Sequence, residues 1–440
     1  MVMAKRGSLT WLWLMVVAAI LTQTALNLLR PVTSYKLLTL GADETAVGLA
    51  TAAYAIVPLV SAMWLGRVTG RLPSLRGMIA LGALVMALAG AALAWGSSVL
   101  MIMAASALLG MGHLVFTIAG QAAIGRRAPR EMMDAAFGWF TAAFSVGQMA
   151  GPLLSGLILG NVPLAQAATG GGLDEEISWA LWLGAGISLL AVPVMFSLRA
   201  QTAPDPTPAA DSRPGGAGDA TTGQPTAQKA TAPRILRVPG VPSHMLAALA
   251  LLAVIDILTA FMPLVGEAAG VSPLWVGVLL AVRGAGSVLS RIFLPWFTAR
   301  WSRNTLVLAA LLVSAVTIGL VPLALEPLGA LWLAAALMAV GGSFLGLGQP
   351  LTMTLIAQAV PADWRGAALG LRLVGNRLGQ VVLPVVAGVV AAPLGPAGGV
   401  WFACAVLGLS GLERILGRHT GPNTPGPDTR GPGGPGANGS

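Results

Sequence analysis

The chemistry open to this chain depends on ionisable side chains that stand inside long apolar stretches. Asp256 is the acid that we place nearest the middle of such a stretch. Because burial favours the neutral form of a carboxyl group, this side chain is suited to bind and release a proton. The alternative is a structural ion pair with Arg283 or Arg377. Asp256 is therefore predicted to be a proton site or a direct partner of one.

Three arginines, Arg30, Arg283 and Arg377, lie in similar apolar surroundings and outnumber that acid. A buried arginine stays charged and can hold a carboxylate through two parallel hydrogen bonds. The excess of arginines predicts a site for an acidic or anionic molecule. The other interpretation is that one arginine pairs with the acid, while the others snorkel to the membrane surface or hold backbone carbonyls.

Neutral polar side chains recur at helical spacing in the same stretches, so that they share one face of a helix. Such side chains are costly beside lipid and usually face protein or water. His113 could relay protons because imidazole titrates near neutral pH, or it could pack through hydrogen bonds alone. Arg291 and Arg372 stand nearer the ends of their stretches and are expected to snorkel. The predicted substrate-binding residues are Gln23, Asn27, Arg30, Tyr54, Arg283, Asn376, Arg377 and Gln380, and the predicted proton-coupling residues are Asp256 and His113.

The elements that must position these residues are transmembrane helices. The chain has 440 residues, of which 56% are hydrophobic and 9% charged, and its mean hydropathy is +0.80. Soluble proteins keep roughly a quarter of their residues charged. Twelve apolar stretches each reach the length, about 20 residues, that spans a bilayer core. The sequence predicts an all-α membrane protein with twelve transmembrane helices.

A glycine-proline motif occurs twice and divides the chain into two similar halves. The first copy has Gly147, Gly151, Pro152 and Gly156, spaced as G-x-x-x-G-P-x-x-x-G. Two of its glycines recur at a constant offset, since 379 − 147 = 232 and 388 − 156 = 232, and Pro384 matches the proline. Small residues at this spacing let helices approach closely, and a proline bends its helix. A site between two repeated halves is the expected arrangement.

The charges are distributed unevenly between the predicted loops. The net charge is +9, but the basic residues gather in the loops of one side and the acids in those of the other. Since positive loops face the cytoplasm, both termini and the central linker are predicted to be cytoplasmic, and nucleic-acid binding is not expected. The single cysteine, Cys404, permits no intrachain disulfide, and no metal site is predicted.

The predicted domains follow from the two halves and from segments of low complexity. Residues 199–243 and 419–440 are rich in small residues, proline and glycine, and are expected to be disordered. The predicted organisation is an N-terminal six-helix bundle at 1–198, a cytoplasmic linker at 199–243, a C-terminal six-helix bundle at 244–418 and a cytoplasmic tail at 419–440.

Two stretches with polar residues are followed by one that is almost free of them, and this order repeats four times along the chain. It resembles the order of helices in the major facilitator superfamily, the twelve-helix secondary transporters. Residues 66–76 resemble that family's G-x-L-A-D-R-x-G-R-R-K loop, with Gly70 in place of the acid. The fifth stretch resembles its antiporter motif, with Ser155 in place of a glycine, whereas Ser106 replaces the arginine of the fourth-helix motif. The resemblance assigns gating or packing roles to Gly66, Arg71, Gly147, Gly151, Pro152, Gly156, Arg300, Gly379, Pro384 and Gly388.

The resemblance implies a secondary active transporter that moves a small organic solute across the inner membrane by alternating access. The fifth-helix motif favours proton-coupled export by an antiporter. The arginines keep open proton-linked uptake of a small organic anion (a carboxylate), and a non-transporting sensor is a remote alternative. The sequence has no G-x-x-x-x-G-K-[ST] loop for a nucleotide, so ATP is not expected to be the energy source, and no cofactor is predicted. It has no His/Glu metal spacing and no nucleophile elbow, so enzyme activity is not predicted. The expected partners are a small-molecule substrate, protons and membrane lipid, and the expected state is a monomer.

Overall fold

The computed structural model of this chain describes residues 10–129, 132–163, 173–196, 231–327, 329–361 and 364–420. Within these ranges the chain is almost wholly helical and has no strand. Twelve of the helices are long and apolar enough to cross a membrane. The all-α fold with twelve membrane-spanning helices that the sequence predicted is therefore confirmed.

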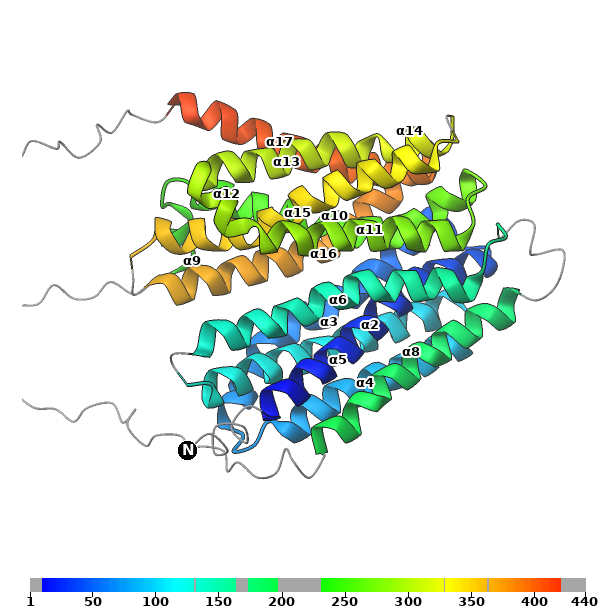
Figure 1. The fold of residues 1–440 in the computed structure, drawn as a ribbon, viewed down its shortest axis with the longest axis horizontal. Coiled ribbons are helices and arrows are strands. Elements are labelled where there is room, and N and C mark those ends of the chain that lie inside the picture. The colour runs from blue at the N-terminus through cyan, green and yellow to red at the C-terminus, as the bar shows by residue number, and fades with distance from the viewer. Residues whose placement is uncertain are drawn as a thin grey trace, which may run out of the picture.

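Six long helices form an N-terminal lobe, coloured blue to green in Figure 1. Two of them begin at side-chain caps: Asp43 accepts a hydrogen bond from the backbone N–H of Ala46 (2.9 Å), and Ser98 accepts one from Met101 (3.3 Å). The helices of this lobe are α2 (Thr10–Thr39), α3 (Glu44–Arg71), α4 (Arg76–Trp95), α5 (Val99–Arg127), α6 (Met133–Leu159) and α8 (Leu173–Phe196).

A second set of six long helices forms the C-terminal lobe, coloured green to red in Figure 1. Short helices continue two of them, each with a proline in its first turn, where a missing N–H costs least. The helices of this lobe are α10 (Val241–Ala268), α11 (Pro273–Ile292) with α12 (Leu294–Arg300), α13 (Arg303–Gly319) with α14 (Val321–Leu325), α15 (Leu331–Ala359), α16 (Arg365–Leu394) and α17 (Pro396–Thr420).

The structure describes only part of the segments expected to be disordered. Residues 197–230 and 421–440 lie outside the described residues. The last part of the predicted linker is ordered as helix α9 (Ala232–Leu236) and the start of α10. Ile235 of α9 is buried against Val241, Ile356 and Ala368 of the C-terminal lobe, so this part of the linker docks on that lobe. One apolar side chain in a polar stretch was too weak a signal to predict a helix.

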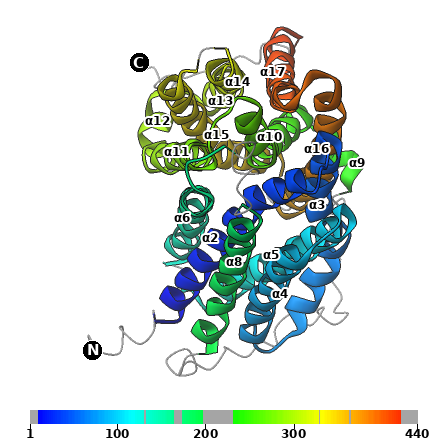
Figure 2. The ribbon, with the colours of Figure 1, turned by 90° about the vertical axis from the view of Figure 1, so that its right-hand side faces the viewer.

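The two lobes lie side by side and are joined by two pairs of helices. Helix α6 packs against α11, and α3 packs against α16, on either side of the molecule when it is viewed along the helices (Figure 2). Between these pairs α2 of the N-terminal lobe contacts α10 of the C-terminal lobe. In Figure 1 the lobes meet at the right and diverge toward the left.

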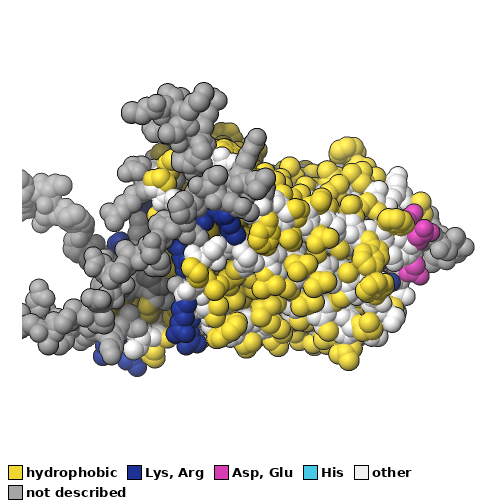
Figure 3. Space-filling model, turned by 90° about the horizontal axis from the view of Figure 1, so that it is seen from below, with side chains coloured by type: hydrophobic (Ala, Val, Ile, Leu, Met, Phe, Trp, Pro, Cys, Tyr) yellow, Lys and Arg dark blue, Asp and Glu magenta, His cyan; other side chains and the backbone are white. Residues whose placement is uncertain are grey.

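The two ends of the bundle carry opposite charges, and an apolar band separates them (Figure 3). We call them the arginine-rich end and the acid-bearing end. The lobes diverge toward the arginine-rich end. The arginine-rich end includes Arg67, Arg71, Arg76, Arg126, Arg127, Arg234, Arg237, Arg300, Arg303 and Arg365, and the acid-bearing end includes Asp43, Glu44, Asp174, Glu175, Glu176, Glu267 and Glu326.

Close glycine contacts join the lobes at the acid-bearing end. A Cβ added to Gly277 of α11 would lie 3.0 Å from Cα of Gly156 on α6, and one added to Gly48 of α3 would lie 3.2 Å from Cα of Gly388 on α16. The two contacts are related by the internal repeat, since 388 − 156 = 232 and 277 − 48 = 229. Gly160 follows the last residue of α6 and has a positive φ of 83°. Its carbonyl accepts a hydrogen bond from the backbone N–H of Leu274, in the first turn of α11, at 3.1 Å.

The loop that resembles the family's gating motif is fastened by an arginine from another helix. Arg126, at the end of α5, donates hydrogen bonds to the backbone oxygens of Thr69 (2.6 Å) and Leu72 (2.7 Å). Gly66 and Arg71, which were expected to act in gating, are exposed at the end of α3, and Arg300 stacks over Trp296 at 4.1 Å.

Replacing Arg126 is expected to loosen this loop. Arg126→Gln removes two charge-assisted hydrogen bonds, each worth about 1.5–3 kcal/mol, so the melting temperature of the purified protein should fall by several degrees. Arg67→Gln is the matched control, because Arg67 is exposed in the same loop region. Equal melting temperatures for the two variants would contradict the fastening role of Arg126.

Candidate functional site

A cavity of about 270 Å³ lies between the two lobes, at the middle of the helices. It is lined by residues of α2, α3, α5 and α6 from one lobe and of α10, α11, α15 and α16 from the other. Helices α4, α8, α13 and α17 contribute no lining residue among those described. The lining residues are Gln23, Leu26, Asn27, Arg30, Tyr54, His113, Thr141, Phe144, Gln148, Leu252, Ile255, Asp256, Arg291, Gln349, Leu373, Asn376, Arg377 and Gln380.

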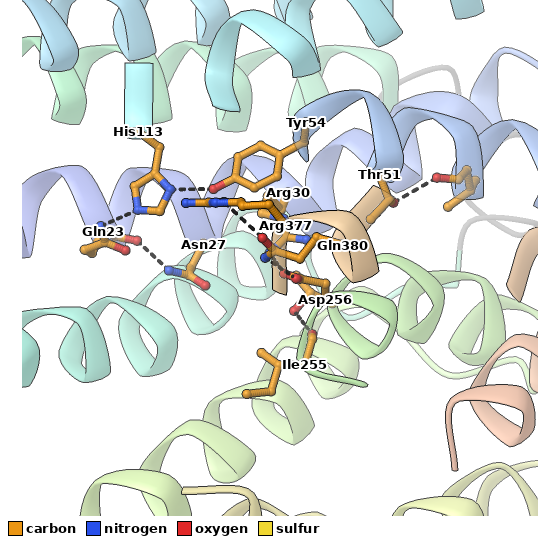
Figure 4. Close-up of polar contacts among 12 residues, drawn as sticks. Gln23, Asn27, Arg30, Thr51, Tyr54, His113, Ile255, Asp256, Arg377 and Gln380 are labelled. Carbon is orange, nitrogen blue, oxygen red and sulfur yellow. Dashed lines mark hydrogen bonds and ion pairs between the residues drawn. The ribbon is translucent and has the colours of Figure 1, made fainter. Parts of the chain in front are cut away.

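An ion pair crosses the cavity from lobe to lobe (Figure 4). Arg30 Nη1 of α2 lies 2.6 Å from Asp256 Oδ1 of α10. The other carboxylate oxygen accepts a hydrogen bond from Gln380 Nε2 of α16 at 2.6 Å, and Arg377 Nη1 donates to Gln380 Oε1 at 3.0 Å. The partner of Asp256 is thus Arg30, rather than the Arg283 or Arg377 that we had considered from sequence.

A second network extends from Arg30 into the N-terminal lobe. The guanidinium of Arg30 lies over the ring of Tyr54, 4.9 Å from its centre. The Tyr54 hydroxyl is 2.6 Å from His113 Nδ1, and Gln23 Nε2 is 3.0 Å from His113 Nε2. Both nitrogens of the imidazole therefore have polar partners. The chain of contacts runs from Gln23 to Asp256 through four helices (Figure 4).

The glycine motif of α6 positions the polar face of α2. A Cβ at Gly147 would lie 2.5 Å from the carbonyl carbon of Gln23, and one at Gly151 would lie 2.6 Å from that of Asn27. Only glycine permits this approach, so the motif brings α6 directly onto the turns that carry the polar residues. In the other lobe Gly379 of α16 faces α10 at the side chain of Leu249 rather than at its backbone.

Arg283 stands apart from the other predicted residues. It does not line the cavity, and only 1% of its surface is exposed. Its Nε and Nη1 are buried without a hydrogen-bond partner among the described residues. Asn376 does line the cavity, and its Oδ1 is also buried without a partner in the described part of the chain.

Arg291 and Gln349 are among the lining residues that the sequence did not assign to the site. Arg291 was expected to snorkel, but it lines the cavity and donates from Nη1 to Ser145 Oγ of the other lobe at 3.0 Å. Gln349 precedes a proline inside α15, and its Nε2 is buried without a partner among the described residues. The signal for Gln349 was a polar residue beside a helix-bending proline; the signal for Arg291 was its i, i+4, i+8 spacing from Arg283.

The polar contact between the lobes in the cavity depends on the charge of one carboxylate. A proton on Asp256 would remove the charge that holds Arg30 and leave a neutral carboxyl that can still bond Gln380. Within the described residues no group of three or more His, Cys, Asp or Glu side chains could hold a metal ion.

Comparison with known proteins gives the family and the fold. A sequence model described as Major Facilitator Superfamily matches residues 12–338 and 245–436. No curated protein sequence matches the chain. Three solved transporters are similar in structure and cover 92–93% of this chain and 96–99% of their own. They are a variant of the nucleoside transporter NupG (14% identity, TM-score 0.71), the D-xylose-proton symporter (14%, 0.72) and an inward-facing, occupied bacterial homolog of the human lysosomal transporter Spinster (16%, 0.68).

At these identities the solved structures show the fold alone, whereas the sequence model shows the family. The match extends over both lobes, and the cavity between them lies where secondary transporters of this fold bind their substrates. The chain belongs to the Major Facilitator Superfamily and is a twelve-helix secondary transporter rather than an enzyme.

Proposed function

We propose that this protein moves a small organic solute by alternating access, with Asp256 as the site that couples transport to protons. The observation that carries the proposal is the Arg30–Asp256 ion pair, which joins the lobes inside the cavity at 2.6 Å. Both side chains are largely buried, at 13% and 7% exposure. Breaking a buried pair costs roughly 3–5 kcal/mol when one charge is left unpaired. Protonation of the carboxylate breaks the pair and leaves Arg30 unpaired, so the proton changes the free energy of the contact between the lobes.

The arginine-rich end is proposed to face the cytoplasm, in keeping with the distribution of basic residues in membrane proteins. In that orientation both termini are cytoplasmic, and the lobes diverge toward the cytoplasm while glycine contacts close the opposite end. The membrane is proposed to be the cell's inner membrane. Since the whole cavity is built within one chain, the working unit is proposed to be a monomer.

Export in exchange for protons is the direction that we propose. Support comes from the glycine-proline motif of α6, which packs on the polar face of α2 at Gln23 and Asn27. In an exporter of this kind, proton binding and solute binding would exclude each other, so that each proton taken up is exchanged for solute.

Proton-linked uptake of a small organic carboxylate is the second candidate. It is favoured by the charge of the cavity, because three arginines and one acid are found among its described lining residues. In this case the proton and the anion would bind together, each relieving the charge of the other's site.

Transport can be tested with purified protein in liposomes that contain a pH-sensitive dye. Solutes from a panel of anions, cations and neutral compounds are added in turn, with the pH gradient imposed in either direction. Proton movement that depends on both protein and solute supports a proton-coupled transporter, and the direction of solute flux against the gradient separates exchange from co-transport. No proton movement with any class of solute would refute the proposed coupling.

Tyr54→Phe is expected to slow proton-coupled flux by about tenfold without changing which solutes are transported. The substitution removes the hydroxyl that bonds His113 and leaves a buried ring nitrogen without its partner, a loss of about 1–3 kcal/mol. Tyr35→Phe is a matched control, because the Tyr35 hydroxyl is buried without a hydrogen-bond partner in the described chain. Initial rates of dye response measure both. Equal rates in the two variants would remove His113 from the mechanism.

A further inference from the structure

We infer that the solute is a small organic dianion, a dicarboxylate, whose two carboxylates are held by Arg291 and Arg377 on opposite walls of the central cavity. The inference rests on the proposed function, since it names the substrate class of the same site. It follows from the charge of the cavity, from the position of the two arginines and from polar atoms of other lining residues that have no hydrogen-bond partner.

The charges that line the cavity do not cancel. The described lining residues include three guanidiniums and one carboxylate, so that 3 − 1 = 2 positive charges remain if His113 is neutral. The carboxylate is already engaged by Arg30 and Gln380, one at each oxygen. Charge within a membrane is costly unless an opposite charge lies near it. A ligand with two negative charges would balance the cavity.

The two remaining arginines lie on different walls. Arg291 belongs to α11, which packs on α6, and Arg377 belongs to α16, which packs on α3, on the other side of the lobe interface (Figure 2). Both residues line the same cavity. A ligand that contacts both must therefore carry its two anionic groups at separate ends.

Each of these arginines is held in place with donors to spare. Arg291 uses Nη1 for Ser145 Oγ and Nε for a long contact of 3.5 Å to the Gly346 carbonyl. Arg377 uses Nη1 for Gln380. A guanidinium has five N–H donors, so the Nη2 group of each can bond a carboxylate of the ligand.

Three polar atoms of the cavity-lining residues are buried without a hydrogen-bond partner in the described chain. One of them, Nη2 of Arg30, belongs to the ion pair between the lobes, and the other two are a donor and an acceptor. Gln349 Nε2 is a donor without an acceptor, and Asn376 Oδ1 is an acceptor without a donor, both buried within the described chain. Buried polar groups are nearly always hydrogen-bonded, so these atoms point to a ligand. A hydroxyl both donates and accepts. A dicarboxylate with a hydroxyl on its chain would thus bind better than one without.

The cavity sets the size of the ligand. Its volume of about 270 Å³ lies at the lower limit of small-molecule sites, which span about 300–1,000 Å³. A small dicarboxylate fits such a space.

The test compares matched ligands on the purified full-length protein. Malate and succinate serve as dianions, monomethyl succinate as the single-charge analogue and succinamide as the neutral one. Apparent affinity is measured from the rise in melting temperature with concentration, and flux from the dye response in liposomes. We expect malate to bind most tightly, succinate next, the monoester about ten- to a hundredfold more weakly than succinate, and succinamide not at all.

Variants then assign the two ends of the ligand. Arg291→Gln and Arg377→Gln should each reduce the preference for succinate over its monoester to about threefold or less, because one carboxylate loses its partner. Arg303→Gln is the control, since Arg303 is exposed at the arginine-rich end, and it should keep the full preference. The preference is a ratio measured on folded protein, so a loss of stability in a variant leaves the test valid.

The outcomes separate this inference from the function on which it rests. If cationic or neutral solutes drive proton movement and dianions do not, the protein is a proton-coupled transporter but the substrate class is wrong. If dianions bind but both variants keep the full preference for succinate, the assignment to Arg291 and Arg377 is wrong. If no solute of any class drives proton movement, the proposed coupling itself fails.

Discussion

Asp256→Asn is expected to abolish proton-driven accumulation of solute, down to the level of protein-free liposomes, while exchange of labelled for unlabelled solute continues. Asparagine has nearly the shape of a protonated carboxyl group but cannot release a proton. The variant would hold the site permanently in the state with Arg30 unpaired. The two fluxes are measured in the same liposomes, with and without a pH gradient.

Two further variants of this chain serve as controls for Asp256→Asn. The double variant Asp256→Asn with Arg30→Gln removes both charges, so no buried guanidinium is left unpaired, and it should regain stability without regaining proton coupling. Asp174→Asn changes an exposed acid at the acid-bearing end and should behave as the parent. Accumulation at parental rates by Asp256→Asn would exclude this carboxylate as the coupling site.

The twelve-helix fold could be predicted from sequence because its causes are local. Each span must supply about 20 apolar residues whatever its neighbours are, and the repeat that begins at Gly147 and Gly379 shows that there are two lobes. The polar residues of α2 could be assigned to one face because helical spacing fixes their direction. For the same reason Gln23, Asn27 and Arg30 all line the cavity.

The pairing inside the cavity could not be predicted, because it depends on which helices of different lobes face each other. Asp256 could have met any of three arginines, and only the packing of α2 against α10 selects Arg30. Arg283 is a second residue whose surroundings could not be predicted. Its helical spacing places it on the same face of α11 as Arg291, yet its turn of α11 packs against Gly342 of α15. Arg291, two turns further along, faces the cavity.

The roles of the glycines also became specific only in three dimensions. The sequence suggested helix contacts for Gly151 and Gly156 without naming partners. In the structure Gly151 meets α2 within its own lobe, whereas Gly156, five residues later, meets α11 of the other lobe. One motif thus packs against the polar face of α2 and also contacts the other lobe at the acid-bearing end. A change of packing at that end can therefore reach the cavity through α6.

Closure of the acid-bearing end can be blocked by adding a side chain at one of its crossings. Gly277→Leu is expected to reduce solute flux by at least about tenfold, because a Cβ at this position already lies 3.0 Å from Cα of Gly156. Overpacking costs about 1–3 kcal/mol, and 1.4 kcal/mol changes a population tenfold, so the closed state should become rare. Gly48→Leu at the repeat-related crossing should act in the same way, since it meets Gly388.

A cross-link reports the gate independently of transport. Asn161 and Ser272 lie at the same end in different lobes, and their side chains are hydrogen-bonded at 2.8 Å, so cysteines at these two positions should form a disulfide when the end is closed. Gly277→Leu should lower the yield of that disulfide. Gly186→Leu should not, because a Cβ there would meet nothing within 4 Å. If Gly277→Leu slows flux but leaves the cross-link at the parental yield, the substitution does not act through closure. If flux and cross-link both stay at parental values, the crossing tolerates a leucine and the prediction is wrong.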